Sequence, residues 1–123
     1  FGSNDPLEIE PRKENPVHGI ASPAGGIFTT AEDMLLFVRA LQNGKLVKRK
    51  TLTEFTTQNA PVPPGGKYAF GFESKLYNGK IGYGHSGGAP GVNTNTITFG
   101  NGDYSVVILT NYDPGFAQVL ARN

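Results

Sequence analysis

The residues from Gly84 to Gly91 combine groups that could do chemistry with a flexible backbone. The stretch reads Gly-His-Ser-Gly-Gly-Ala-Pro-Gly, so an imidazole and a hydroxyl are adjacent and glycines flank them. An imidazole can transfer a proton near neutral pH. A hydroxyl can attack a carbonyl carbon or bind a substrate oxygen, and glycine allows a ligand to approach the backbone closely. The stretch therefore predicts part of a functional site.

Two serine-hydrolase signatures resemble this stretch, but the rest of the sequence opposes both. Gly84 to Gly88 matches Gly-x-Ser-x-Gly, the nucleophile elbow of α/β-hydrolases, which would make Ser86 the nucleophile. That elbow leads into a helix and needs a later histidine, whereas Pro90 breaks a helix and no histidine follows His85. The stretch also resembles the Gly-Asp-Ser-Gly-Gly-Pro signature of trypsin-like proteases, with His18 as a candidate base. However, His85 replaces the aspartate, and 123 residues are too few for the two barrels of that fold.

A helix is predicted upstream of the stretch, from about Ala31 to Gln42. Thr30 can accept a hydrogen bond from a free amide of the first turn, and Glu32 and Asp33 place negative charge at the positive end of the helix dipole. Asn43-Gly44 can supply the left-handed residue that ends the helix. One apolar face is formed by Met34, Leu35, Val38 and Leu41.

The pattern changes from helix to strand after a second, shorter helix, predicted from about Arg49 to Thr57. Tyr68, Phe70 and Phe72 alternate, and they predict one face of a strand that reaches about Leu76.

The second half of the chain predicts further antiparallel strands. Asn78-Gly79 is a strong hairpin signal, so Lys80 to His85 should return along the preceding strand and carry the glycine-rich stretch at its end. Two more strands are predicted, from about Val92 to Phe99 and from about Tyr104 to Asn111. The second contains the unbroken apolar run Val106 to Leu109, which predicts a strand covered on both faces.

These elements together predict an α+β fold, with an antiparallel β-sheet of about three to four strands packed with α-helices. Tight turns leave no room for the crossovers of a parallel sheet. Asp113-Pro114 predicts the start of a last helix, as N-cap and first position. Residues 1–22, where prolines recur among scattered charges, predict an irregular segment, and residues 23–123 predict the folded part.

Composition argues against several classes of function. With 11 basic and 10 acidic residues the formal net charge is +1, so no nucleic-acid partner and no binding to an anionic membrane is expected. No apolar run approaches the roughly 20 residues that span a bilayer. Cysteine is absent and no zinc-like spacing surrounds His18 or His85, so neither a metal nor a cofactor is expected. One basic cluster, expected to be a solvated surface, consists of Lys45, Lys48, Arg49 and Lys50.

Four segments match one family in their order and spacing. They are Ser22 to Asp33, Tyr68 to Phe72, Gly84 to Gly91 and Val106 to Asn111. This part of the chain resembles the C-terminal part of the serine β-lactamase-related family, which includes class C β-lactamases, D-alanyl-D-alanine carboxypeptidases and related esterases. The resemblance implies a β-lactamase/transpeptidase-like domain, of which residues 23–123 would form the C-terminal portion without the N-terminal catalytic part.

The resemblance also implies roles for four residues. The third catalytic motif of the family is Lys-Thr-Gly, or His-x-Gly in the esterase-like and peptidase-like branches, and it matches His85, Ser86 and Gly87. His85 would lie near the nucleophile and its base, and the Gly88 amide would be one of two oxyanion donors. Ser86 would bind a substrate carboxylate or carbonyl, and Gly87 would let the substrate lie against the strand. The alternative is structural: the glycines permit a tight strand connection and His85 caps a sheet edge.

The nucleophile and base of the family come from Ser-x-x-Lys, and this pattern does not occur in the sequence; neither does Tyr-x-Asn or Tyr-x-Ser. In the family these motifs lie N-terminal to the matched region. The chain therefore resembles the C-terminal part of a serine hydrolase that acts through an acyl-enzyme on β-lactams, D-alanyl peptides or small esters. Alone it is expected to be inactive, with the missing N-terminal part as its partner. The alternative is a non-catalytic module of the same fold that binds a peptide or another partner.

An exposed strand edge follows from the same resemblance. In the resembled fold the strand that matches Tyr104 to Asn111 pairs with the first N-terminal strand. Residues 104–111 are therefore expected to form an apolar edge that supports a homodimer or a swapped strand. The resemblance favours the cell envelope, periplasmic or extracellular, because of the peptidoglycan-directed members of the family. The cytoplasm is the alternative, because of the esterase-like members.

Overall fold

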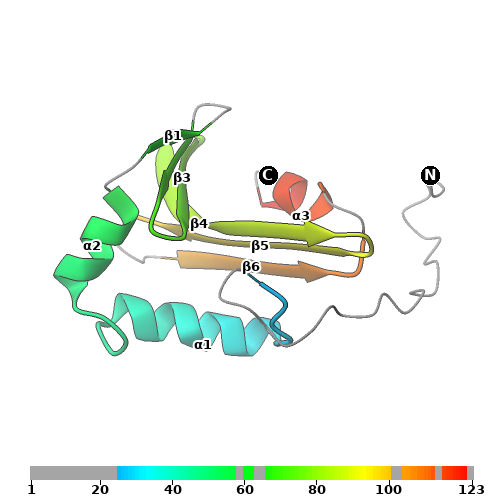
Figure 1. Ribbon diagram of the computed structural model, residues 1–123, viewed down its shortest axis with the longest axis horizontal. Helices are drawn as coiled ribbons and strands as arrows, with labels where there is room; N and C mark the ends of the chain where they lie inside the picture. Colours follow the sequence, from blue (N-terminus) through cyan, green and yellow to red (C-terminus); the bar gives the residue numbers. More distant parts are fainter. Residues whose placement is uncertain (1–24, 58–59, 63–65, 101–103, 113–114, 122–123) are drawn as a thin grey trace.

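The computed structural model describes residues 25–57, 60–62, 66–100, 104–112 and 115–121. Six strands form one antiparallel sheet and lie across it in chain order (Figure 1). Their bounds are Ala60–Val62 (β1), Gly66–Ala69 (β2), Phe72–Tyr77 (β3), Lys80–Ala89 (β4), Val92–Phe99 (β5) and Tyr104–Thr110 (β6). The α+β fold is confirmed, and the sheet is wider than the three to four strands predicted, because the short strands β1 and β2 extend it.

Helices α1 (Ala31–Gln42) and α2 (Arg49–Thr57) have the predicted bounds. Thr30 Oγ1 accepts a hydrogen bond from the Asp33 amide at 3.1 Å, which is the predicted cap. Gly44 follows α1 with φ +72°, so it is the predicted left-handed residue. Local capping residues thus determine where α1 begins and ends.

Helices α1 and α3 (Phe116–Leu120) cover opposite faces of the sheet (Figure 1). At the end of α1, Gln42 Nε2 donates to Ser105 Oγ of β6 at 3.3 Å, and Ser105 Oγ lies 3.0 Å from Thr98 Oγ1 of β5. At the start of α3, the Ala117 amide donates to Asn93 Oδ1 of β5 at 2.6 Å. Because side chains alternate along a strand, Thr98 and Asn93 point to opposite faces.

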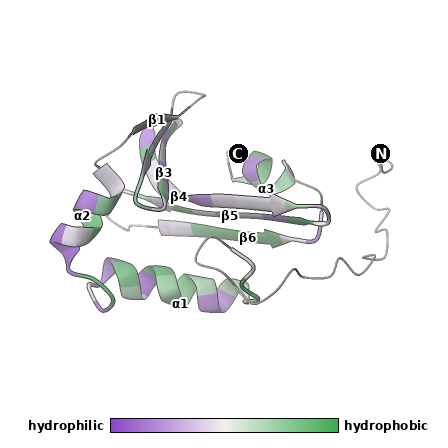
Figure 2. Cartoon of the chain, viewed as in Figure 1, coloured by the Kyte–Doolittle hydropathy of each residue, from purple (hydrophilic) through white to green (hydrophobic). Residues whose placement is uncertain are grey.

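The core lies on both sides of β5. Its buried apolar side chains are Val38, Leu41, Leu52, Ala69, Ile97, Phe99 and Ala117. Figure 2 shows that apolar residues also continue around α1. There Leu36 is 61% exposed and Phe37 is 50% exposed, so α1 is apolar on the side that faces away from the sheet as well as on the predicted face.

The single strand predicted from Tyr68 to Leu76 is wrong. Phe70 and Gly71 have φ of 33° and 89°, and Ala69 pairs with Phe72 across them. Two successive positive φ angles make a two-residue hairpin turn, so the apolar alternation spans two strands instead of one. The turn escaped prediction because Phe70 is an uncommon residue in this conformation.

The glycine-rich stretch lies within a strand and not at its end. The predicted hairpin at Asn78-Gly79 is confirmed, with φ of 46° and 81°. The returning strand, β4, continues past His85 to Ala89 and pairs with β5 throughout the stretch. Pro90-Gly91 then forms the two-residue connection to β5.

Two predictions near the C-terminus need correction. The N-cap of α3 is Gly115, with φ 116°, and not Asp113; Asp113-Pro114 lies outside the described residues. In β6, which is the last strand of the described sheet, Val106 to Ile108 are half-buried and Leu109 is 36% exposed. The apolar run is therefore not fully covered on both faces.

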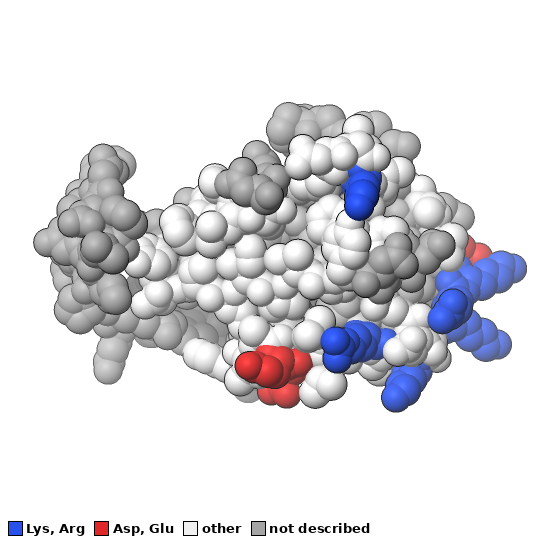
Figure 3. Space-filling model, turned by 180° about the vertical axis from the view of Figure 1, so that it is seen from behind, with Lys and Arg blue, Asp and Glu red and all other residues white. Residues whose placement is uncertain are grey.

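The basic cluster lies on the surface, as predicted. Its members, Lys45, Lys48, Arg49 and Lys50, are all exposed. Figure 3 shows basic side chains gathered at one end of the molecule. Within the described ranges, no helix has the length and apolar character needed to cross a membrane. The irregular segment predicted for residues 1–22 lies outside the described residues.

Candidate functional site

Strand β4 is paired differently along its two halves. β3 pairs with β4 from Lys80 as far as Gly84, whereas β5 pairs with it from Gly82 to Ala89. Among the described strands, none covers the outer edge of β4 beyond Gly84. The candidate site residues His85, Ser86, Gly87 and Gly88 all lie in this half, which we call the open edge of β4.

The backbone direction along the open edge follows from three contacts. Ala89 pairs with Val92 across a two-residue turn, the Gly100 amide donates to Ile81 O at 3.5 Å, and Asn93 Nδ2 donates to Gly87 O at 3.0 Å. Odd-numbered residues of β4 therefore direct their carbonyls toward β5. Because backbone direction alternates along a strand, the amides of Ser86 and Gly88 point the other way, to the open edge. Gly88 is an exposed residue on this edge.

His85 lies over the open edge and is held at both ring nitrogens. Its Nδ1 is 2.6 Å from Ser86 O, and its Nε2 is 3.3 Å from the Tyr68 hydroxyl. The rings of Tyr68 and His85 meet edge to face at 5.7 Å between centroids. A carbonyl only accepts, so Nδ1 carries a proton, and in the neutral ring Nε2 accepts from Tyr68. The exposed imidazole is thus oriented, with Nε2 as its proton acceptor.

Ser86 points to the face of β4 opposite Gly87, where it meets an ion pair. Its Oγ donates to Glu73 Oε1 at 3.4 Å, and Glu73 Oε2 accepts from Lys75 Nζ at 2.6 Å. A serine bonded to a carboxylate is directed as a donor, which leaves its lone pairs for another donor. The structure therefore brings His85 and Ser86 to one edge but turns their side chains to different faces.

Two glycines of β4 are required for different reasons. A Cβ added at Gly84 would overlap the carbonyl group of Thr96, a backbone atom that cannot swing away. A Cβ at Gly87 would lie 3.1 Å from Thr94 Oγ1, a side-chain atom that can rotate. Gly84 thus permits close packing of β4 on β5, whereas Gly87 leaves one face of the open edge without a side chain.

Three neighbours of the site were not identified from the sequence: Tyr68, Glu73 and Asn93. Tyr68 was predicted on one face with Phe70 and Phe72, and the turn at Phe70 is what brings it to His85. Glu73 carried no local signal, because its contact with Ser86 depends on strand register. Asn93 could have been suspected, since it alternates with Asn95 in a buried strand and buried polar groups need partners.

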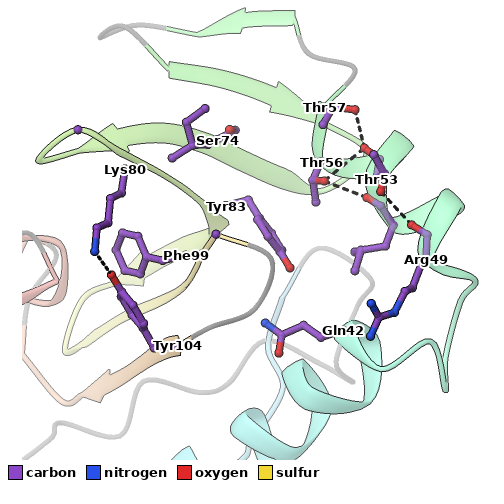
Figure 4. A pocket seen from close by; sticks show the side chains of 14 residues that line it. Gln42, Arg49, Thr53, Thr56, Thr57, Ser74, Lys80, Tyr83, Phe99 and Tyr104 are labelled. Carbon is purple, nitrogen blue, oxygen red and sulfur yellow. Dashed lines mark hydrogen bonds between the residues drawn. The ribbon is translucent and has the colours of Figure 1, made fainter.

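A cavity of about 730 Å³ lies at the other end of β4 (Figure 4). It is bounded by α2, the end of α1 and the β3–β4 hairpin. Lys80 Nζ donates to Tyr104 OH at 2.6 Å on one side of it, and Arg49 lies on the other. Tyr83 and Gln42 point toward one another between them. Among the described lining residues there are two cations and no carboxylate, so the cavity is basic. None of these lining residues belongs to the open edge, so the two sites are separate.

Burial raises the pKa of the Tyr83 phenol above its ordinary value, while hydrogen bonds with Gln42 and Thr98 act in the opposite direction. A raised pKa disfavours the phenolate, so Tyr83 lines the cavity as a neutral hydrogen-bonding group. In the part of the chain that the structure describes, no three His, Cys, Asp or Glu side chains gather as metal ligands would.

Comparison with known proteins adds three findings. The model of the family described as "Beta-lactamase" matches residues 2–123. The crystal structure of a penicillin binding protein from Bacillus halodurans is similar, with a TM-score of 0.65 and 26% sequence identity. The match covers 76% of this chain but 29% of that one, so the chain spans less than a third of that protein's length. No curated protein matches the chain.

Proposed function

The chain belongs to the beta-lactamase family, and we propose that its open edge forms one wall of the acyl-transfer site of a serine hydrolase. The observation that carries the proposal is the exposed half of β4, where the Gly88 amide is directed outward beside an oriented His85. An edge strand with outward amides can bind an extended substrate by main-chain hydrogen bonds and can stabilise charge on its carbonyl oxygen.

Each residue of the open edge has a role in this proposal. The Gly88 amide donates to the oxyanion, and Gly87 leaves room for the substrate against the strand. The Nε2 atom of His85 accepts a hydrogen bond near the nucleophile and its base, and donates one when the ring is protonated. Ser86 binds a substrate carboxylate or carbonyl, a role that requires its hydroxyl to leave Glu73.

The nucleophile itself comes from outside these residues, because the sequence contains no Ser-x-x-Lys. In the proposed reaction a serine hydroxyl gives its proton to a base, its oxygen adds to the substrate carbonyl carbon, and the π electrons move to the carbonyl oxygen. The carbonyl forms again as the bond from this carbon to the leaving nitrogen or oxygen breaks, the leaving group takes the proton from the base, and an acyl-enzyme remains. Water then gives a proton to the base and adds to the same carbon, the bond to the serine oxygen breaks, the serine takes the proton, and the acid is released. The chain alone is therefore inactive.

The proposed substrates are a β-lactam, a D-alanyl peptide or a small ester. All three contain an acyl carbonyl that a serine can attack. The open edge suits them because its exposed donors are main-chain amides, which recognise a carbonyl without selecting a side chain. Selection among the three classes depends on surfaces beyond the described residues.

The test is complementation. The chain is assayed with a chromogenic cephalosporin and a chromogenic ester, alone and together with a polypeptide that carries the N-terminal part of the family fold and its Ser-x-x-Lys. Hydrolysis in the combined sample only is the expected result. In the combined sample, His85→Ala tests the role of the imidazole, and it should reduce the rate of hydrolysis by about 10² to 10⁴.

A second candidate function is a binding module of the same fold, favoured by the accessible strand edge and the missing nucleophile. It predicts saturable binding of a D-alanyl peptide to the chain, with no hydrolysis in either sample. That result would replace the hydrolase proposal.

A further inference from the structure

We infer that Asn93 is a positioning residue that aims the Gly88 amide at the open edge by holding the carbonyl of Gly87. The inference rests on the proposed function, in which that amide donates to the oxyanion. It concerns a residue of the neighbouring strand, on the face of the sheet away from α1.

Asn93 uses both ends of its side-chain amide. It is fully buried, with 0% exposure. Its Nδ2 donates to Gly87 O at 3.0 Å, and its Oδ1 accepts from the amides of Gly115 at 3.2 Å and Ala117 at 2.6 Å. Exchanging the oxygen and nitrogen would set donors against donors at α3 and an oxygen against the Gly87 carbonyl. These partners therefore allow one orientation only.

Planarity of the peptide bond transmits this contact to the site. The Gly87 carbonyl and the Gly88 amide belong to the same trans peptide group, in which C=O and N–H point in opposite directions. A carbonyl held toward β5 therefore directs the amide away from β5, to the open edge. The pairing of Gly87 with Thr94 also directs this carbonyl toward β5, and the bond from Asn93 adds a side-chain anchor. Two adjacent glycines restrict their own backbone less than any other pair, so the added anchor matters here.

The side chain of Asn93 is held by the start of α3, whose amides donate to its oxygen. Thr110 Oγ1 of β6 donates at 3.1 Å to the main-chain carbonyl of Asn93 and does not contact its side chain. The peptide group of the site is thus connected to α3 through one buried side chain. If α3 moved away from the sheet, the Asn93 side chain would lose the two hydrogen bonds at its oxygen.

The decisive variant is Asn93→Asp, with Thr110→Val as the matched control. Aspartate keeps an oxygen for the two α3 amides but replaces the donor to Gly87 with an oxygen that repels its carbonyl. Valine at position 110 removes a bond to Asn93 without touching Gly87. In the chain labelled with ¹⁵N-glycine, the Gly88 resonance should shift and its ¹⁵N{¹H} NOE should fall in Asn93→Asp only. A Gly88 signal unchanged in a folded Asn93→Asp chain would overturn the inference.

A measurement on the unmodified chain keeps the inference testable if Asn93→Asp does not fold. The side-chain amide protons of Asn93 should exchange with solvent at least about tenfold more slowly than those of the exposed Asn78. Equal rates would show that the bond to Gly87 is not maintained.

The complemented protein separates this inference from the proposed function. There Asn93→Asp should lower kcat by about 10- to 100-fold and leave KM unchanged, because an amide displaced by about 1 Å stabilises the oxyanion less. Thr110→Val should leave both constants unchanged. If no combined sample hydrolyses any substrate, the proposed function fails, and the NMR data alone decide whether Asn93 orients Gly88. A normal kcat in Asn93→Asp with a displaced Gly88 amide would exclude the positioning role.

Discussion

The first half of β4, from Lys80 to Gly84, pairs with β3 and, from Gly82 on, with β5 as well, whereas the second half, from His85 to Ala89, pairs with β5 alone. Both halves are rich in glycine, but glycine serves a different purpose in each. In the paired half it permits the backbone of β5 to approach closely. In the open half Gly87 and Gly88 leave the sheet faces beside the outward amide without side chains. The comparison teaches that composition alone does not distinguish a packing glycine from a site glycine; the neighbouring strand does.

The largest expected difference between the halves is in stability. Gly84→Ala should lower the free energy of unfolding by about 3 kcal/mol or more, because its Cβ meets the Thr96 carbonyl. Gly87→Ala should cost less than about 1 kcal/mol, because Thr94 Oγ1 can rotate away. Urea denaturation of the two variants at pH 7 measures both values. Equal losses would contradict the distinction between the halves.

The paired half should also become sensitive to high pH through Tyr83. Burial raises its folded-state pKa above the unfolded value of about 10, so the unfolded chain loses the proton first as the pH rises. This contribution to stability is fully present below pH 10 and is lost as the pH passes through the folded pKa.

Tyr83→Phe removes this dependence. At pH 7 it should cost about 1 kcal/mol for the lost hydrogen bonds. Between about pH 9.5 and pH 11.5, its urea midpoint should fall less steeply than that of the unmodified chain. Parallel midpoint curves would show that Tyr83 does not contribute in this range.

Strand β6, the last strand of the described sheet, provides a second test of what a strand at a sheet edge does. Its residues Val106 to Ile108 are apolar and only half-buried, unlike the glycines of the open edge of β4. We expect the chain to form dimers through residues 104–111 at high concentration. Light scattering measures this, and Leu109→Lys, at an exposed apolar residue of β6, should restore a monomer. A monomeric unmodified chain at all concentrations would contradict the expectation.

The smallest effect is expected at the surface of the open half. Tyr68→Phe removes one exposed hydrogen bond and should change stability by less than about 0.5 kcal/mol. Long-range ¹H–¹⁵N spectra should show Nδ1–H as the neutral tautomer of His85 in the unmodified chain, and Tyr68→Phe should shift its Nε2 resonance. Tyr77→Phe, which removes a hydroxyl elsewhere, is the control. A neutral ring protonated at Nε2 would contradict the described orientation.

Sequence patterns located the elements that depend on local residues. Thr30 and Gly44 limit α1, and Asn78-Gly79 forms the β3–β4 hairpin, because capping and turn formation involve only adjacent residues. The turn at Phe70 was missed, since a phenylalanine rarely adopts positive φ without tertiary support. The contact between Tyr68 and His85 was therefore not predicted either, because it depends on this turn.

The candidate site was predicted as a stretch of sequence but not as a geometry. His85 to Gly88 were identified by residue type and by resemblance to a family motif. Which amides face outward depends on where β3 stops pairing, and the role of Asn93 depends on contacts between β5, β4 and α3. Contacts between distant segments of this kind have no local sequence signal.

The most direct measurement of the central claim compares Gly88→Pro with Gly88→Ala in the complemented protein. Proline removes the amide hydrogen that the oxyanion would use and fixes φ, and an edge strand tolerates it where the amide faces solvent; alanine keeps the amide. If the open edge supplies an oxyanion donor, proline should lower kcat by about 10² to 10³, while alanine retains most of the activity. Equal activity of the two variants would contradict the claim.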